Sequence, residues 1–185
     1  MIINPKTADG WLEEKVMGAA RNVIVHKLRA ADHEDRFRIY HPVTRKNTPI
    51  YVHAKVMIVD DWFVKIGSSN LNNRSLGFDT ECDLAVEANA LGVKDKKSRT
   101  MIENMMNDLL SEHLGVEGAL HSETQRKSKR RLIPAIERLL KCRGRTLKEL
   151  KLPKLNKEDS KNAADSIFDP EQPSSLIPKL KRAFS

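Results

Sequence analysis

Residues 51–87 contain the side chains whose types and spacing could do chemistry. His53 and Lys55 form the single His-x-Lys pair of this 185-residue chain. Four residues separate Lys55 from Asp60, and six more lead to Gly67-Ser68-Ser69-Asn70. An imidazole with an ordinary pKa near about 6.5 can attack phosphorus or deliver a proton. The pattern H-x-K-x4-D-x6-G-S-x-N is therefore suited to the chemistry of a phosphodiester.

The neighbouring polar groups complete this hypothesis. Lys55, Ser68 and Asn70 can donate to phosphate oxygens where charge builds in a transition state. Glu81 could accept a hydrogen bond from the second ring nitrogen of His53 and so fix its tautomer and orientation. We expect no metal and no cofactor, because the sequence has no cluster of His, Cys or acidic residues at metal-ligand spacing.

Simpler interpretations exist for each residue taken alone. A single His on a strand is usually a structural residue and a single Lys a solvated charge, but the complete pattern favours catalysis. Asp60 follows a strand and precedes Asp61, so a role in the turn is favoured over chemistry. Arg74 could bind substrate phosphate together with Ser69 and Asn72, or it could brace its loop, and the two interpretations are equally open.

Three strands are predicted to position these groups. In residues 51–60, alternation places His53 and Lys55 on one face and an apolar set on the other, which we expect to be core. Residues 63–66 lead into Gly67. Residues 80–88 alternate acidic with apolar side chains, which predicts a buried thiol at Cys82. The result would be a sheet with one polar and one apolar side.

The remaining elements follow from apolar spacing. Residues 1–4 and 36–41 are predicted strands, and residues 12–31 a helix with one apolar stripe. A second helix with a methionine stripe should end near Gly115, and a third should span residues 132–140. From residue 151 onward, prolines with polar spacers indicate a tail that wraps the domain or stays loose.

Charge and composition limit the possible partners. Residues 1–93 hold 12 basic and 12 acidic residues, so the net charge of +8 comes from the remaining 21 basic and 13 acidic residues. A basic stretch at 126–154 could meet anionic lipid or, as a weaker alternative, nucleic acid, although a solvated surface is slightly favoured. Two cysteines form no disulfide framework, and we see no signal peptide or membrane span. A cytoplasmic or peripheral membrane location is expected.

The pattern around His53 resembles the HKD signature of the phospholipase D superfamily. The chain as a whole is similar to the C-terminal half of bacterial phospholipase D proteins, to about residue 172, and further likeness lies in Glu112-His113-Leu114-Gly115 and Gly144-Arg145-Thr146-Leu147. The resemblance implies an α/β fold, an α-β-α sandwich around a mixed sheet. It also implies a half-domain at residues 1–115, followed by a basic helical extension and tail at 116–185.

The resemblance further implies two HKD half-sites, one supplying a nucleophilic His that becomes phosphohistidine and the other a general acid. This chain has one HKD motif. Either a homodimer joins two copies of His53, or the chain is a fragment, or half of a split enzyme, whose N-terminal half with the second motif is elsewhere. The likeness to a C-terminal half favours the second interpretation and predicts that His53 is the general acid. Under either interpretation a monomer should show almost no turnover.

Three functions stay open at this point. The first is hydrolysis or transfer of the head group of glycerophospholipids, which the resemblance favours. The second is a nuclease of the same superfamily, which would use the basic tail. The third is a catalytically inactive fragment that acts as an interaction module.

Overall fold

The computed structural model describes residues 1–6, 11–89, 95–116, 132–142 and 146–155, with side chains omitted for 11–16. Its order is α1 (Trp11–Ala31), β1 (Tyr40–Pro42), β2 (Lys55–Val59), β3 (Phe63–Gly67), α2 (Asn73–Gly77), β4 (Asp83–Glu87), α3 (Lys96–Leu114), α5 (Leu132–Leu140) and β5 (Leu147–Glu149). The expected α/β class is confirmed. The basic segment 126–131 and the tail from 156 onward lie outside the described residues.

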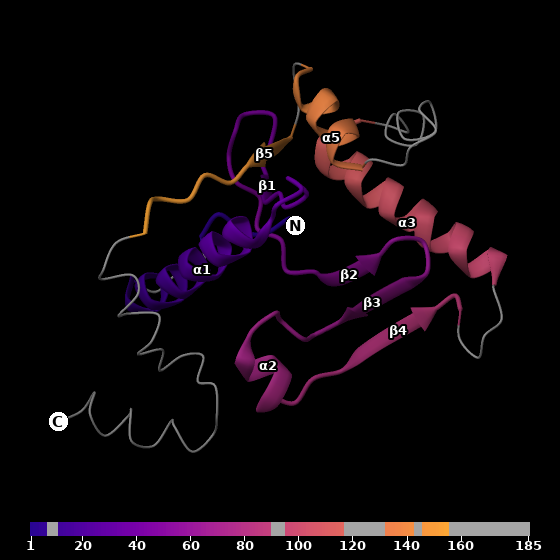
Figure 1. Cartoon of the computed structure of the whole chain (residues 1–185), viewed down its shortest axis with the longest axis horizontal. Coiled ribbons are helices and arrows are strands. Elements are labelled where there is room, and N and C mark those ends of the chain that lie inside the picture. The colour runs from indigo at the N-terminus through magenta and orange to yellow at the C-terminus, as the bar shows by residue number, and fades with distance from the viewer. Residues whose placement is uncertain (7–10, 90–94, 117–131, 143–145, 156–185) are drawn as a thin grey trace. The chain divides into compact units, whose positions relative to one another are not determined.

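The described strands form two antiparallel sheets, where one mixed sheet was expected. β2, β3 and β4 pair in that order, and β1 pairs with β5 (Figure 1). The turn from β2 to β3 spans three residues, and so short a connection requires antiparallel neighbours. Within the described part of the chain, parallel pairing is limited to one bridge between Ile2 and Tyr40, which accounts for the strand predicted at residues 1–4.

Contacts divide the chain into two units. The first comprises Met1–Asn4, Arg38–Ser68 and Cys82–Glu149, and the second Pro5–Phe37, Ser69–Glu81 and Leu150–Ser185. The first unit contains both sheets with α3 and α5, and the second contains α1 and α2.

Two apolar clusters hold the first unit together. In one, Tyr40 and Leu147 from the two-stranded sheet pack with Leu114, Ala135 and Ile136 from α3 and α5. Residues on both sides of position 115 therefore share this core. In the other cluster Val64, Ala88 and Ile102 are buried and join the three-stranded sheet to α3.

α3 ends where the sequence predicts. Gly115 adopts a left-handed φ of 66°, and its N–H donates to Glu112 and Ser111 carbonyls. Such a residue closes a helix at low cost because glycine has no Cβ. At the other end Asp95 accepts from the N–H groups of Lys97 and Ser98, a regular N-cap.

The apolar face of the three-stranded sheet is only partly buried, contrary to expectation. Ile58 and Val64 pack at the end covered by α3, whereas Val56, Ile66 and Leu84 are 39%, 45% and 77% exposed. These three residues align across the strands, because Val56 pairs with Ile66 and Ile66 with Leu84. α3 therefore covers one end of this face and leaves the row Val56–Ile66–Leu84 open.

In the second unit, α1 is a helix of 21 residues. Ala19, Asn22 and Val25 are its buried residues with described side chains, while Leu28, expected on the apolar stripe, is 44% exposed. After α1 the Asp32 carboxylate accepts from the backbone N–H groups of Arg36 and Phe37, and these hydrogen bonds lower the pKa of Asp32. Among the described residues no helix is both long and apolar enough to cross a membrane.

Candidate functional site

His53 lies in a segment without regular secondary structure that leads into β2, and β2 starts two residues after His53. Its ring is exposed and stacks on Tyr51, with ring centroids 6.0 Å apart and planes 21° from parallel. Stacking restricts how the imidazole can turn while its edge stays accessible. Of the strand predicted at 51–60, the structure forms Lys55–Val59 as β2, and residues 51–54 before it have no regular secondary structure.

Asn4 fixes the backbone directly before His53. Its side-chain Nδ2 donates to the Val52 carbonyl at 3.0 Å, and its Oδ1 accepts from the Val52 N–H at 2.7 Å. The amide thus pairs with Val52 as a neighbouring strand would. Sequence reasoning missed Asn4, because no local pattern links position 4 to position 52. The structure gives it a positioning role next to the candidate catalytic histidine.

Lys55 is the first residue of β2, and its ammonium contacts the backbone of His53. Nζ donates to the His53 carbonyl oxygen at 2.9 Å. This contact brings Lys55 to the backbone of His53. A primary ammonium has three donors, so one contact leaves capacity for phosphate oxygens.

Gly67 closes the motif-bearing hairpin opposite Lys55. Lys55 pairs with Gly67, and Gly67 with Asp83, so the three residues form one row across the sheet. A Cβ at position 67 would lie against Oδ1 of Asp83 and only 2.6 Å from both the Asp83 Cα and the Cys82 carbonyl oxygen. The site therefore needs glycine for space, since two of these obstacles are backbone atoms.

Ser68 continues the pairing one residue beyond the strand. Its N–H donates to the Cys82 carbonyl at 3.1 Å, and its Oγ accepts from the Cys82 N–H at 2.9 Å. These two hydrogen bonds fix the backbone at the point where the chain leaves β3. Cys82 itself is exposed, so the predicted buried thiol is wrong. The strand predicted at 80–88 begins only at Asp83, which places Cys82 outside the sheet.

The other candidate residues belong to the second unit. Ser69 is buried, Asn70 is exposed and Glu81 is half-buried. Asn72 caps α2, because its Oδ1 accepts from the Ser75 N–H at 2.9 Å. The roles predicted for Asn70 and Glu81 toward His53 join residues of different units, and they stay predictions.

Arg74 braces its own loop in the second unit. Its Nε and Nη2 donate to the two oxygens of Asp79 at 3.1 and 2.8 Å, a bidentate pair. The hydrogen bond from Arg74 holds the pKa of Asp79 below its usual range. Of the two interpretations open for Arg74, this geometry supports the structural one, and phosphate binding stays a prediction.

Asp60 and Asp61 form the turn between β2 and β3. Asp60 adopts a left-handed φ of 48°, a conformation that Asp tolerates better than most residues. Asp61 accepts from Arg99 at 3.1 Å, which ties the turn to α3. Position 60 therefore has a conformational reason to carry Asp, as expected for a turn residue.

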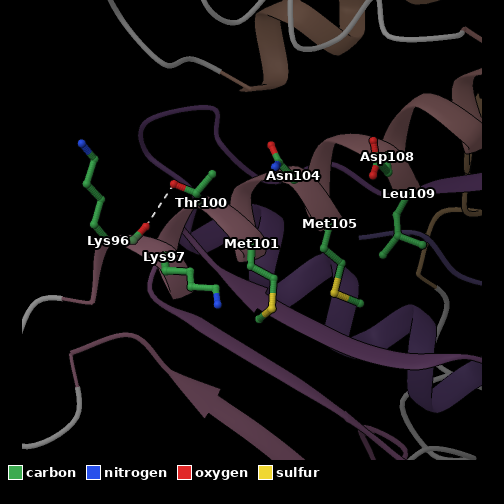
Figure 2. Close-up of a pocket in the computed structure, with 8 residues that line it drawn as sticks. All are labelled: Lys96, Lys97, Thr100, Met101, Asn104, Met105, Asp108 and Leu109. Atoms are coloured by element: carbon green, nitrogen blue, oxygen red, sulfur yellow. Dashed lines mark hydrogen bonds between the residues drawn. The ribbon is translucent and has the colours of Figure 1, made fainter.

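A separate hollow of about 960 Å³ runs along α3 (Figure 2). Met101, Met105 and Leu109 line it from one side of the helix, with Lys96 and Lys97 at its start. It contains none of the motif residues, so we do not assign it to the phosphodiester chemistry. Among the described residues no group of three His, Cys, Asp or Glu side chains gathers to hold a metal ion.

Comparison with known proteins identifies the family. The family model described as Phospholipase D matches residues 19–149, which include the whole motif from His53 to Glu81. The matched segment also includes β5, the strand that completes the core with α3 and α5. The chain belongs to the phospholipase D family.

Individual relatives match over shorter segments. Phospholipase D alpha 2 of Oryza sativa subsp. japonica is 39% identical over 70 residues, which cover 36% of this chain and 9% of that protein. Phospholipase D delta of Arabidopsis thaliana is 38% identical over 73 residues, covering 37% and 8%. Phospholipase D alpha 1 of Nicotiana tabacum is 37% identical over 81 residues, covering 41% and 10%.

The matched segments amount to about a tenth of the length of these relatives. No solved structure matches the chain. Family membership therefore rests on the family model, and the activity of a whole enzyme is a matter for proposal.

Proposed function

We propose that the chain supplies one half of a phospholipase D-type active site, which hydrolyses or transfers the head group of glycerophospholipids. The observation that carries the proposal is the complete H-x-K-x4-D-x6-G-S-x-N pattern within a segment matched by the Phospholipase D model. The names of the three plant relatives support phospholipid as the substrate class.

The proposed reaction has two displacements at phosphorus. A nucleophilic histidine attacks phosphorus, and the bond to the head-group oxygen breaks while an acid protonates that oxygen. Water or an alcohol then attacks the phosphohistidine, losing its proton to the group that acted as acid, and the phosphorus–nitrogen bond breaks. His53 takes the acid and base role when a separate N-terminal half supplies the nucleophile, and either role in a homodimer.

The local geometry suits His53 for proton transfer. The ring is exposed, held on Tyr51 and preceded by a backbone segment that Asn4 fixes. Lys55 lies at the His53 carbonyl, where its ammonium could also bind a non-bridging phosphate oxygen. Ser68, Asn70 and Glu81 are proposed to complete the half-site with the roles given by the sequence pattern.

The test is transfer to ethanol. The chain, together with its partner half-site, is incubated with phosphatidylcholine vesicles and ethanol, and phosphatidylethanol is measured by mass spectrometry. We expect product that disappears in His53→Gln and falls at least about a hundredfold in Lys55→Met. Product formed equally well by His53→Gln would contradict the proposal, and salt-sensitive cleavage of DNA without lipid turnover would select the nuclease.

A further inference from the structure

All charged side chains of the three-stranded sheet share one face. Lys55, Lys65, Asp83 and Glu87 lie on the face that contains Gly67, as the register of the strands requires. The opposite face is wholly apolar and includes the row Val56–Ile66–Leu84, whereas the charged face also carries apolar residues such as Met57 and Ala85. The charged face is the one that presents the motif residues Lys55 and Gly67.

Two lysines and one carboxylate meet around Gly67. Lys65 donates from Nζ to Oδ2 of Asp83 at 3.1 Å, and the two side chains are 26% and 25% exposed. The other oxygen of Asp83 lies over Gly67, in the space that a Cβ would fill. Asp83 therefore reaches across the glycine of the motif to neutralise Lys65, two residues before it.

Lys55, at the other side of Gly67, has a different environment. Its ammonium donates to a neutral carbonyl, and it forms no ion pair with any described residue. Around Gly67 the sheet thus presents one ammonium whose charge is balanced by a carboxylate, that of Lys65, and one whose charge is not balanced, that of Lys55.

We infer that Asp83 is a specificity-determining residue, which matches the charge of this half-site to a phosphodiester. The inference rests on the proposed function. A diester carries one negative charge and a phosphate monoester close to two near neutral pH. With the charge of Lys65 balanced by Asp83, Lys55 is the one unbalanced ammonium in this part of the sheet, so the attraction that distinguishes a dianion from a monoanion is kept small.

Removing the Asp83 charge should change that balance. Lys65 would become a second uncompensated ammonium beside Gly67. Coulomb attraction scales with the charge of the ligand, so a dianion gains about twice the free energy that a monoanion gains. Asp83→Asn should therefore shift preference toward dianions.

The experiment measures anion binding to the full chain by nuclear magnetic resonance, following the backbone amides of Gly67 and Ser68. The probes are inorganic phosphate at a pH where it is a dianion, and diethyl phosphate. In the wild type we expect affinities within about threefold of each other, and in Asp83→Asn an affinity ratio shifted about fivefold toward inorganic phosphate.

Three variants complete the design. Glu87→Gln removes an acid from the same face at the far end of β4, and it should leave the ratio unchanged. Lys65→Met with Asp83→Asn removes both charges and should restore the wild-type ratio. Lys65→Met alone leaves Asp83 unbalanced and should weaken binding of the dianion more than of the monoanion; this variant decides the matter if Asp83→Asn does not fold.

An unchanged ratio in Asp83→Asn, an equal shift in Glu87→Gln, or no response of Gly67 and Ser68 to either probe would overturn the inference. Because binding needs no turnover, absence of phosphatidylethanol together with the expected ratios would count against the proposed function and leave the role of Asp83 intact. Transfer activity with an unchanged affinity ratio would support the proposed function and overturn the role of Asp83.

Discussion

A side-chain amide holds the backbone next to the candidate catalytic histidine. Asn4 makes two hydrogen bonds to Val52, and Val52 directly precedes His53. A hydrogen bond of this kind contributes about 1 kcal/mol, and its two atoms together specify one backbone position. The residue that Asn4 fixes is Val52, the neighbour of His53. The Asn4 side chain therefore influences the position of the His53 ring indirectly, through the backbone.

Asn4→Ala is predicted to loosen this segment. Loss of the Oδ1 acceptor should speed hydrogen exchange of the Val52 amide by about fivefold, as expected for loss of about 1 kcal/mol. The Thr48 amide, which donates to the side chain of Thr44, is an internal control in the same spectrum and should be unchanged. Equal exchange of Val52 in both proteins would contradict the positioning role of Asn4.

Gly67 is limited by the space around it. Gly67→Ala is predicted to lower the free energy of unfolding by about 1–3 kcal/mol, because a methyl group would press on the backbone of Asp83 and Cys82. Urea unfolding followed by circular dichroism measures the change. Gly77→Ala is the matched control, since a Cβ there meets no atom within 4 Å, and it should cost far less. Similar losses in both variants would rule out steric crowding at Gly67.

At the scale of elements, the two-stranded sheet contains a pH-sensitive pair. His41 on β1 is the cross-strand partner of Lys148 on β5. Burial, and then the charge of Lys148, lower the pKa of His41. Burial also lowers the pKa of His113 near the end of α3, with a smaller opposing effect of Glu112.

This pair predicts loss of stability in mild acid. A histidine whose pKa is depressed on folding binds fewer protons in the folded than in the unfolded state, so unfolding becomes easier as pH falls below about 6.5. Depressed carboxylates such as Asp79 and Asp95 lose their contribution only at lower pH, below their usual pKa of 3.8. Urea unfolding at pH 7.5 and at pH 5.5, on the order of one unit either side of 6.5, measures the effect.

His41→Gln should reduce this pH dependence, because the residue that titrates on β1 is gone. Lys148→Met should reduce it as well, since the adverse charge is removed from β5. A wild-type protein that is more stable at the lower pH would show that these histidines do not determine the pH dependence of its stability.

Helices followed from the sequence more closely than strands did. α5 was predicted with its observed bounds, and α3 ends at Gly115 as expected, since an apolar stripe and a left-handed glycine are local signals. β2 starts later than predicted because its partner β3 ends at Gly67, opposite Lys55. Strand length thus depends on the partner strand, which local alternation does not reveal.

Non-local partners also explain the residues that sequence reasoning missed. β5 has three residues and forms by pairing with β1, more than one hundred residues earlier along the chain by numbering. The clamp of Asn4 on Val52 joins positions 48 apart. The cap at Asn72 differs, because an Asn before a short helix is a local signal that could have predicted α2.

At the scale of the whole molecule, the proposed function requires a second HKD motif. The chain has a single His-x-Lys pair, and the chemistry proposed for the family needs a nucleophile and an acid. Acid–base assistance alone is worth about 10²–10⁴-fold in rate. A chain without its counterpart lacks one of the two groups.

We therefore predict that a monomeric form hydrolyses an aryl phosphodiester at most at about a hundredth of the rate of a dimer or a reconstituted two-half enzyme. Light scattering coupled to gel filtration assigns the oligomeric state of each fraction, and absorbance of the released phenol gives the rate. His53→Gln is the control for contaminating activity. Strong, His53-dependent turnover in a monomeric fraction would show that one half-site suffices.

The uncovered row Val56–Ile66–Leu84 has a consequence for handling the protein. Leu84 sits on β4, a strand at the edge of its sheet whose five residues are all exposed. An exposed apolar edge strand is a template for edge-to-edge aggregation, which proteins commonly prevent with a lysine. Leu84→Lys should therefore raise the soluble fraction on expression, measured after centrifugation of the lysate. Met101→Lys makes the same change of charge at an exposed apolar residue of a helix, α3, and should raise it far less.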